Sequence, residues 1–286
     1  MTIKAGLEPG KVALITGGSS GIGKSIACGL AERGMHVWLV AQRKDMLETA
    51  RKDVEAHRKN PDQQVGIVSA DVSDINEVRS AVNYICEESG PPDLLVNSAG
   101  MAHPGYVEKL DIDIYSWMME VNYFGTVYMT KEVIPAMIKR GSGYIVNISS
   151  GAGLISYFGY TAYCASKFAV RGFTDALRQE LKPHGIGVSI VYPSDTDTAQ
   201  LEYENHYKPV ETKALSGTAG SMMSPDQVAR EVLQGIERGK YQILNGLELK
   251  LFYRINGMSE GLVRFAIDQM IRGAQKKKNS VHPPQE

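Results

Sequence analysis

The sequence of 286 residues predicts an α/β protein, with a doubly wound parallel β-sheet of about seven strands and helices on both faces. Short continuous apolar runs alternate with longer helical runs, as expected when strands are buried on both faces by crossover helices. Hydrophobic residues make up 43% and charged residues 22% of the chain, which excludes disorder throughout. No repeat or composition shift marks a boundary, so we expect a single domain over residues 1–286.

The first half of the chain contains four strand candidates, each centred on a short apolar run. They span residues 11–16, 36–41, 65–71 and 93–97. Helical runs separate them, at residues 23–33, at residues 44–57 and after Asp74. The second of these runs is rich in charge and should be mostly exposed. Asp74 is a suitable N-cap for the third, because its carboxylate can accept from the free N–H groups of a helix start.

The second half continues this alternation as far as residue 244. Strands are expected at residues 143–149, 188–192 and 241–244, and helices at residues 115–139, 162–181 and 224–238. The last helix has a clear start, because Ser224 is an N-cap, Pro225 suits the first helical position and Gln227 closes a capping box. Right-handed crossovers bring the carboxyl ends of parallel strands to one edge of the sheet, where we expect the ligand site.

Two segments break the alternation. Residues 193–223 are rich in Asp, Thr, Glu, Tyr and Gly with little apolar periodicity, which predicts a long irregular loop that serves as a substrate lid. Residues 247–286 read as an amphipathic C-terminal extension, which either docks on its own domain or a partner subunit, or lies peripherally in a bilayer surface. The run Lys276–Lys278 suits anionic lipid, or is simply a solvated tail.

Charge and cysteine content limit the partners and the compartment. The net charge of −1 argues against general nucleic-acid binding. Cys28, Cys86 and Cys164 are too sparse for a disulfide framework, and the six histidines form no ligand-spaced cluster, so no metal is expected. No stretch of about 18 uncharged apolar residues occurs. We therefore expect a cytoplasmic protein, or one that lies against a membrane on its cytosolic side.

A glycine-rich turn follows the first expected strand and opens a helix. It reads Thr-Gly-Gly-Ser-Ser-Gly-Ile-Gly over residues 16–23. Glycine reaches the φ values of a tight turn without strain, and its bare backbone lets a pyrophosphate approach the N–H groups of the helix start. The turn therefore predicts nucleotide binding, although an ordinary glycine-rich turn is the alternative.

The spacing T-G-x-x-x-G-x-G resembles that of the short-chain dehydrogenase/reductase family. Two further motifs agree, Asn-Ser-Ala-Gly over residues 97–100 and Tyr163-x-x-x-Lys167, and the resemblance covers residues 11–242. It implies a Rossmann-type NAD(P)-binding domain that forms homodimers or homotetramers through its two long helices, residues 115–139 and 162–181. It also implies dinucleotide contacts from Gly17, Ser19, Ser20, Gly21, Ile22, Gly23, Asn97, Ala99 and Gly100.

The end of the second expected strand bears on the choice of dinucleotide. Residues 41–44 read Ala-Gln-Arg-Lys, with no carboxylate to oppose a 2′-phosphate. Arg43 can clamp that phosphate, with Lys44 beside it, unless both residues merely begin a solvated helix. The sequence therefore predicts NADPH. By the same resemblance Asp71 bonds the adenine amino group and Val72 packs beside it, with a plain helix start as the alternative.

Tyr163 and Lys167 form the expected chemical centre, because residues four apart share one face of a helix. A nearby ammonium and the positive nicotinamide ring should lower the tyrosine pKa, so that the phenol can protonate a carbonyl oxygen as hydride reaches its carbon. In the family Lys167 also binds the nicotinamide ribose. Ser150, thirteen residues before Tyr163, matches the family serine that holds the carbonyl, and Ser149 is its rival.

The resemblance assigns roles to four more residues. Asn122 matches the family asparagine that holds a water in the proton relay, and its alternative is a helix-interior amide that bonds its own backbone. After the sixth expected strand the family passes the chain over the nicotinamide, at Pro193 in this sequence. Thr196 and Thr198 follow and can touch the carboxamide or diphosphate, or can be polar loop residues.

Four segments resemble one branch of that family, the 3-ketodihydrosphingosine reductases: residues 158–163, 192–198, 208–212 and 224–229. The branch implies NADPH-dependent reduction of a long-chain amino ketone to its alcohol in sphingolipid synthesis. A long alkyl chain needs an apolar channel, and Asp195, Asp197 or Glu211 can pair with the amino group. Gln42 departs from the arginine of that branch, and Ser194 and Ala199 replace two of its prolines.

Two other functions remain open at the level of sequence. The first is a short-chain reductase that acts on another hydrophobic ketone or alcohol, such as a steroid, a retinoid or a 3-oxoacyl chain. The second is a non-catalytic nucleotide-binding protein of the same fold. The intact set of Ser150, Tyr163 and Lys167 favours an enzyme.

Overall fold

The structure is a computed structural model that describes residues 2–216, 222–258, 261, 265 and 268–275. Over these residues the strands form one seven-stranded parallel sheet, with the order β3-β2-β1-β4-β5-β6-β7. The predicted doubly wound α/β fold is confirmed. The strand order reverses between β1 and β4, and in open α/β sheets ligands bind in the crevice at such a reversal.

The strands lie where the apolar runs predicted them. They are β1 (Val12–Thr16), β2 (His36–Ala41), β3 (Val65–Ser69), β4 (Leu94–Asn97), β5 (Gly143–Ile148), β6 (Ile186–Tyr192) and β7 (Gln242–Leu244). The register places Thr16 beside Asn97, and Asn97 beside Asn147. These three polar residues lie near the carboxyl ends of neighbouring strands, so the central sheet ends at one edge in a polar row.

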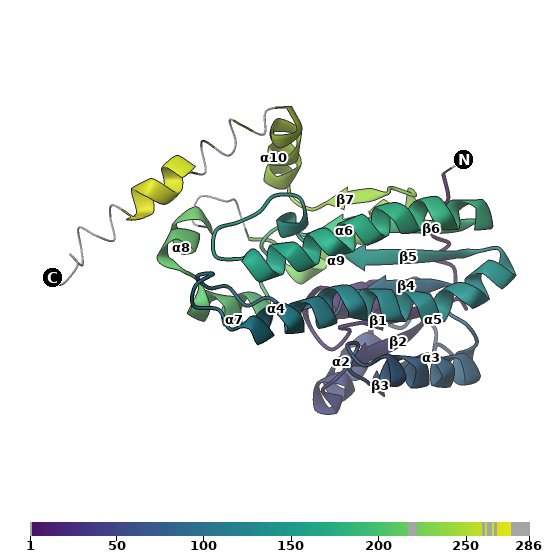
Figure 1. Ribbon diagram of the computed structural model, residues 1–286. Coiled ribbons are helices and arrows are strands. Elements are labelled where there is room, and N and C mark those ends of the chain that lie inside the picture. The colour runs from purple at the N-terminus through teal and green to yellow at the C-terminus, as the bar shows by residue number, and fades with distance from the viewer. Residues whose placement is uncertain (1, 217–221, 259–260, 262–264, 266–267, 276–286) are drawn as a thin grey trace.

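Helices cover both faces of the sheet (Figure 1). One face is covered by α1 (Gly21–Ala31), α2 (Lys44–Ala56) and α9 (Pro225–Glu237), and the other by α3 (Ile75–Ser89), α5 (Gly125–Arg140) and α6 (Thr161–Leu181). Alternate side chains of β1 enter the two cores: Ala13 and Ile15 one core, Val12 and Leu14 the other. Burial on both faces explains why the strands read as continuous apolar runs.

The long helix expected at residues 115–139 is more complex than predicted. It begins earlier, as α4 (Ile112–Met118) capped by Asp111, passes through a π-helical turn η1 (Met119–Phe124), and continues as α5. A π-turn holds one residue more than an α-helical turn, and such turns often occur at functional sites. Apolar spacing alone does not reveal it, because the helix is regular on either side.

The segment 193–223 was predicted to be irregular, and that prediction was wrong for most of it. It contains α7 (Ala199–Tyr207) and α8 (Val210–Ser216), and residues 217–221 lie outside the described residues. None of the α7 residues is fully buried, so the helix lacks the apolar stripe on which a sequence-based assignment depends. Thr198 caps it, since the hydroxyl accepts from the N–H of Leu201 at 3.3 Å.

The C-terminal extension is described in part. Its helix α10 (Leu247–Met258) buries Leu249 against Ile190 and Tyr192, while Leu247 is 82% exposed. This helix therefore docks on its own domain through one side. The run Lys276–Lys278 lies outside the described residues. Within the part of the chain that is described, no helix has both the length and the apolarity to cross a bilayer.

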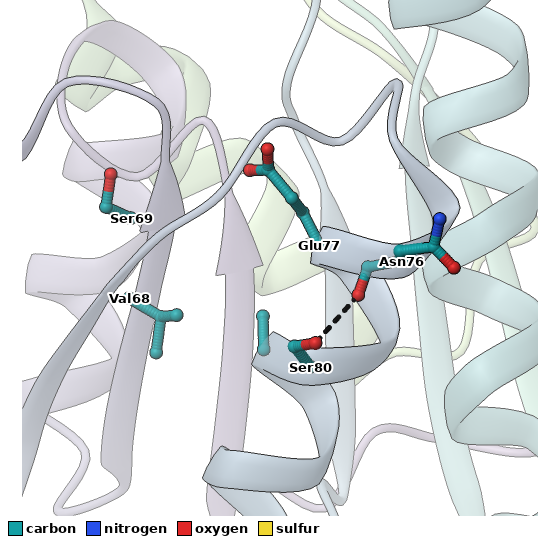
Figure 2. Close-up of a pocket in the computed structure, with 6 residues that line it drawn as sticks. Val68, Ser69, Asn76, Glu77 and Ser80 are labelled. Atoms are coloured by element: carbon teal, nitrogen blue, oxygen red, sulfur yellow. Dashed lines mark hydrogen bonds between the residues drawn. The ribbon is translucent and has the colours of Figure 1, made fainter.

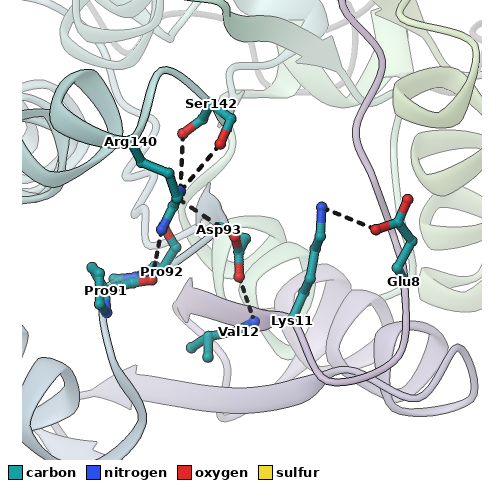
Figure 3. A network of polar contacts seen from close by, with 8 residues as sticks. All are labelled: Glu8, Lys11, Val12, Pro91, Pro92, Asp93, Arg140 and Ser142. Atoms are coloured by element: carbon teal, nitrogen blue, oxygen red, sulfur yellow. Dashed lines mark hydrogen bonds and ion pairs between the residues drawn. The ribbon is translucent and has the colours of Figure 1, made fainter.

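A polar network joins elements at the amino ends of the central strands (Figure 3). The carboxylate of Asp93 accepts from the N–H of Val12 at 3.0 Å, and Arg140 reaches Asp93 at 3.5 Å and the carbonyl of Pro92 at 2.8 Å. Nearby, Lys11 pairs with Glu8 at 3.1 Å. These contacts tie β1, β4 and the end of α5 together at the edge opposite the carboxyl ends.

Candidate active site

A large cavity lies at the carboxyl ends of the strands, with a volume of about 1890 Å³. Small-molecule pockets commonly measure about 300–1,000 Å³, so this cavity has room for a dinucleotide and a second ligand. Most of the site residues expected from the sequence line it: Gly17, Ser19, Ser20, Gly21, Ile22, Gly23, Arg43, Asp71, Val72, Ala99, Gly100, Ser150, Tyr163, Lys167, Pro193, Thr196 and Thr198. Lys44, Asn97 and Asn122 do not form part of its wall.

The glycine turn between β1 and α1 is shaped for a close backbone approach. Gly17 and Gly21 have φ values of 64° and 53°, which favour glycine. A Cβ atom at Gly17 would meet the amide nitrogen of Ala99 at 2.8 Å, and one at Gly23 would meet the carbonyl oxygen of Gly17 at 2.5 Å. Ser20 precedes α1 without a side-chain cap, which leaves the first N–H groups of the helix for a ligand. The turn fits a pyrophosphate.

The loop after β4 is fastened to β1 by Thr16, whose hydroxyl oxygen accepts from the N–H groups of Ser98 and Ala99, both at 3.0 Å. Asn97 lies behind this loop and is buried. Its amide donates to Thr130 at 3.0 Å and to Asn147 at 2.9 Å. Asn97 therefore stabilises the strand ends from inside, while Ala99 and the residue after it face the cavity.

Asp71 lies at the cavity wall after β3. Partial burial acts to raise its pKa, but hydrogen bonds from the Ser73 hydroxyl at 2.6 Å and N–H at 2.8 Å hold the pKa of this carboxyl below its usual range. Glu77 of α3 accepts from the Asp71 N–H at 2.8 Å, and its side chain also lines a small hollow between β3 and α3 (Figure 2). Asp71 is thus a fixed carboxylate at the cavity wall.

Ser150 follows β5 and caps a short 3₁₀ turn, η2 (Gly151–Gly153), by accepting from the N–H of Ala152 at 3.1 Å. The Ser150 hydroxyl lies near enough to the phenol of Tyr163 in α6 to act toward lowering the tyrosine pKa. The hydroxyl of Ser149 instead donates to the carbonyl oxygen of Lys167 at 3.1 Å and is buried. Of the two neighbouring serines, Ser150 is the one placed beside the phenol.

The electrostatics of the centre differ from the expectation. Burial raises the pKa of Tyr163, the carboxylate of Glu204 raises it further, and the bond from Ser150 acts against both. Burial lowers the pKa of Lys167 to about 8, and Glu204 opposes that shift. Lys167 does not lower the pKa of Tyr163 as expected, because its amine lies 5.7 Å from the centre of the Tyr163 ring and donates to the carbonyl of Ile148 at 3.1 Å. The lowering expected from a bound nicotinamide ring stays a prediction.

Asn122 lies in the π-turn, and its side chain bonds Met101 and Ser166 rather than the backbone of its own turn. The amide oxygen accepts from the N–H of Met101 at 2.7 Å, and the amide nitrogen donates to the carbonyl of Met101 at 2.9 Å and to Ser166 at 2.9 Å. A Cβ atom at Gly100 would lie 3.0 Å from the Asn122 amide oxygen and 3.2 Å from the Lys167 amine. Asn122 thus orients the loop after β4 beside Lys167, and its role in a proton relay stays a prediction.

The acidic side chains expected from the sequence are dispersed. Asp195 lines the cavity and is exposed, whereas Asp197 is exposed and lies outside the wall. Glu211 is 2% exposed, accepts from the hydroxyl of Tyr106 at 2.8 Å and also lies outside the wall. Thr198 lies against the glycine turn, since a Cβ atom at Gly21 would meet its methyl group at 3.2 Å.

Glu204 of α7 is a wall residue that the sequence interpretation missed. Its two oxygens accept from the hydroxyl of Tyr160 at 2.6 Å and from the amide of Gln200 at 3.1 Å. The available signal was the spacing of Gln200, Glu204 and Lys208, which are four residues apart and so share one side of a helix. That signal went unused because the segment was interpreted as irregular.

Comparisons with known proteins agree with this geometry. The family model for short chain dehydrogenases matches residues 11–208. The chain is 43% identical over 234 residues to the 3-ketodihydrosphingosine reductase of Mus musculus, which covers 82% of this chain and 70% of the relative.

Solved structures of short-chain dehydrogenases and ketoreductases superpose on this chain over most of its length. A short chain dehydrogenase/reductase from Burkholderia phymatum in complex with NAD superposes with a TM-score of 0.78 at 25% identity, over 89% of this chain and 95% of that one. An actinorhodin polyketide ketoreductase with NADPH gives a TM-score of 0.73 at 30% identity, over 82% and 95%. With its glycine turn, its Ser150–Tyr163 pair and these relatives, the chain belongs to the short-chain dehydrogenase/reductase family of oxidoreductases.

Proposed function

We propose that the protein is an NADPH-dependent reductase that converts 3-ketodihydrosphingosine to dihydrosphingosine. The observation that carries this proposal is the placement of Ser150, Tyr163 and Lys167 together in one cavity that also contains the glycine turn. The substrate is inferred from the name of the mouse relative. The identity of 43% over 82% of this chain supports the same substrate for this protein.

The side chains suit the reduction of a ketone. A bound reduced dinucleotide supplies the hydride that the carbonyl carbon accepts. Ser150 donates a hydrogen bond to the ketone oxygen, and Tyr163 transfers its phenolic proton to the same oxygen as negative charge develops there. Lys167 lines the same cavity with its amine 5.7 Å from the centre of the Tyr163 ring, where it would bind the ribose hydroxyls of the dinucleotide.

The preference for NADPH rests on the end of β2. Arg43 lines the cavity there, and no carboxylate lies in residues 41–44 to repel a 2′-phosphate. We expect Arg43→Ala to raise the KM for NADPH by about 10- to 100-fold, the range of a lost charge-assisted hydrogen bond, with little change for NADH.

Lys44→Ala is the matched control for this prediction, because the neighbouring cation lies outside the cavity wall. Steady-state kinetics with both dinucleotides measure the effect. Equal loss with NADPH and NADH in Arg43→Ala would show that the guanidinium does not recognise the phosphate.

The lipid tail of the substrate matches the apolar part of the cavity. Its wall includes Met101, Trp117, Leu249, Leu251 and Met270, of which the last three belong to the C-terminal extension. Burial of alkyl groups is favourable by about 0.8 kcal/mol per CH₂, so turnover should depend on chain length.

The assay is NADPH oxidation with 3-ketosphinganine, with NADH as the comparison cofactor. The substrate panel adds shorter amino ketones, a steroid ketone, a retinal and a 3-oxoacyl ester. We expect the long-chain amino ketone to give the highest kcat/KM. A higher value for any of the other classes would reject the proposed substrate, and no turnover of any ketone would favour a non-catalytic binding protein.

A further inference from the structure

Glu204 is the carboxylate most firmly held beside the reacting groups. It belongs to the wall of the same cavity as Ser150 and Tyr163. Its partner Tyr160 lies on the chain three residues before Tyr163, and the two rings are 5.8 Å apart. The negative charge of Glu204 acts on both Tyr163 and Lys167, as the pKa shifts of those groups show. The bond to Tyr160, whose ring packs beside that of Tyr163, and the shared cavity wall place the side chain close to the point where the carbonyl must bind.

The carboxylate is fixed by neutral donors. Tyr160 occupies one oxygen and Gln200 the other, and Gln200 is itself held through the carbonyl of Ala102 at 3.1 Å. An ionised carboxylate offers about four acceptor positions, so two bonds leave capacity for another donor. The chain thus holds a preoriented acceptor at the cavity wall.

The charged groups around Glu204 leave it without an ion-pair partner among the described residues. The positive charge of Lys208 acts to lower the pKa of Glu204, and the negative charge of Asp195 acts to raise it. The charge of Glu204 in turn acts to raise the pKa of Lys167. Burial raises the pKa of Glu204, because the charged form is poorly solvated there. A cationic ligand that enters the cavity would relieve this cost.

We propose that Glu204 binds the primary ammonium group of the substrate and so determines the specificity of the enzyme for amino ketones. This proposal rests on the proposed function. The amino group of such a substrate is attached to the carbon next to the ketone. When Ser150 and Tyr163 hold the carbonyl, the ammonium group therefore lies beside Glu204. Tyr160 and Gln200 act as positioning residues that keep the carboxylate facing the cavity.

The other acidic side chains are less suited to this role. Asp195 lines the cavity but is exposed, so water screens its charge. Asp197 and Glu211 do not form part of the wall, and Glu211 is already bound by Tyr106. Glu204 alone of these four combines a place in the wall with two fixed hydrogen bonds.

The test compares two substrates in the full chain with NADPH. The first is 3-ketosphinganine, and the second is the same long-chain 1-hydroxy-3-ketone without the amino group. Glu204→Gln keeps the shape of the side chain and removes its charge. We expect this variant to lower kcat/KM for the amino ketone by about 10- to 100-fold and to leave the desamino ketone nearly unchanged.

Glu202→Gln is the matched control, since Glu202 lies on the same helix and is exposed. Asp195→Asn tests the main competitor. Should Glu204→Gln not fold, Glu204→Asp replaces it, because the shortened carboxylate should also lose the preference for the amino ketone.

Three results would overturn the proposal. An equal loss with both ketones in Glu204→Gln would show that the residue acts on the catalytic groups. No loss with either ketone would show that it does not meet the ammonium, and a changed ratio in Asp195→Asn alone would assign the role to Asp195. Wild-type protein that reduces neither ketone would reject the proposed function itself, which is a separate outcome.

Discussion

Replacing Tyr163 with phenylalanine should lower kcat for ketone reduction by about 10³- to 10⁴-fold, the upper part of the range for general acids. The substitution removes the phenolic hydroxyl that we propose as the proton donor and leaves Ser150 and Lys167 unchanged. Dinucleotide affinity should change little, because the glycine turn and Arg43 are untouched. Steady-state turnover and a fluorescence titration with NADPH measure the two effects.

Tyr115→Phe provides the matched control for this loss. Its hydroxyl bonds the side chain of Thr161 at 2.8 Å at the start of the same helix α6, but it lies outside the cavity wall. That variant should retain nearly full kcat. A Tyr163→Phe protein that keeps more than about a tenth of the wild-type kcat would exclude Tyr163 as the proton donor.

Lys167→Met should lower the activity strongly and make the protein more stable than the wild type at pH 7. The lysine is only 4% exposed, and burial lowers its pKa to about 8, so the folded state carries the cost of a poorly solvated charge. Methionine fills similar space without charge. We expect a gain of about 1–3 kcal/mol in the free energy of unfolding and a loss of about 10²-fold or more in kcat.

The stability that Lys167→Met gains over the wild type should decrease as the pH rises. The folded-state pKa of Lys167 lies below the unfolded value of 10.5, so the lysine destabilises the fold fully below pH 8 and loses that effect as the pH rises toward 10.5. The advantage of Lys167→Met should therefore shrink over that window. Lys131→Met, at an exposed position of α5, should show no such trend. A constant or growing advantage in urea melts at pH 7, 9 and 10.5 would contradict the assignment.

The sheet and the glycine turn of the cavity wall could be predicted from the sequence, because their signals are local. A buried strand must be apolar along its length, and a tight phosphate-binding turn must contain glycine at positions such as Gly17 and Gly21. The pairing of Tyr163 with Lys167 follows from helical spacing. These features depend on few distant contacts, so the order of residues is enough to identify them.

The remaining features depend on contacts between distant segments. Glu204 is recognised as part of the site only when α7 lies beside Tyr160 at the start of α6, and the bond between them spans segments far apart in the chain. The amide of Asn122 could not be assigned to Met101, because its direction depends on the π-turn. The pKa of Tyr163 was misjudged for a similar reason, since burial and the charge of Glu204 are properties of the packed site.

The peripheral position of α7 has a consequence for how proteins of this kind diverge. None of its residues is fully buried, yet it supplies a wall of the cavity. Substitutions that leave the core intact usually change stability by less than about 0.5 kcal/mol, so this helix can drift across lineages with little penalty. New substrate preferences can arise there while the reacting groups after β5 and on α6 stay unchanged, which makes α7 a natural target for redesign.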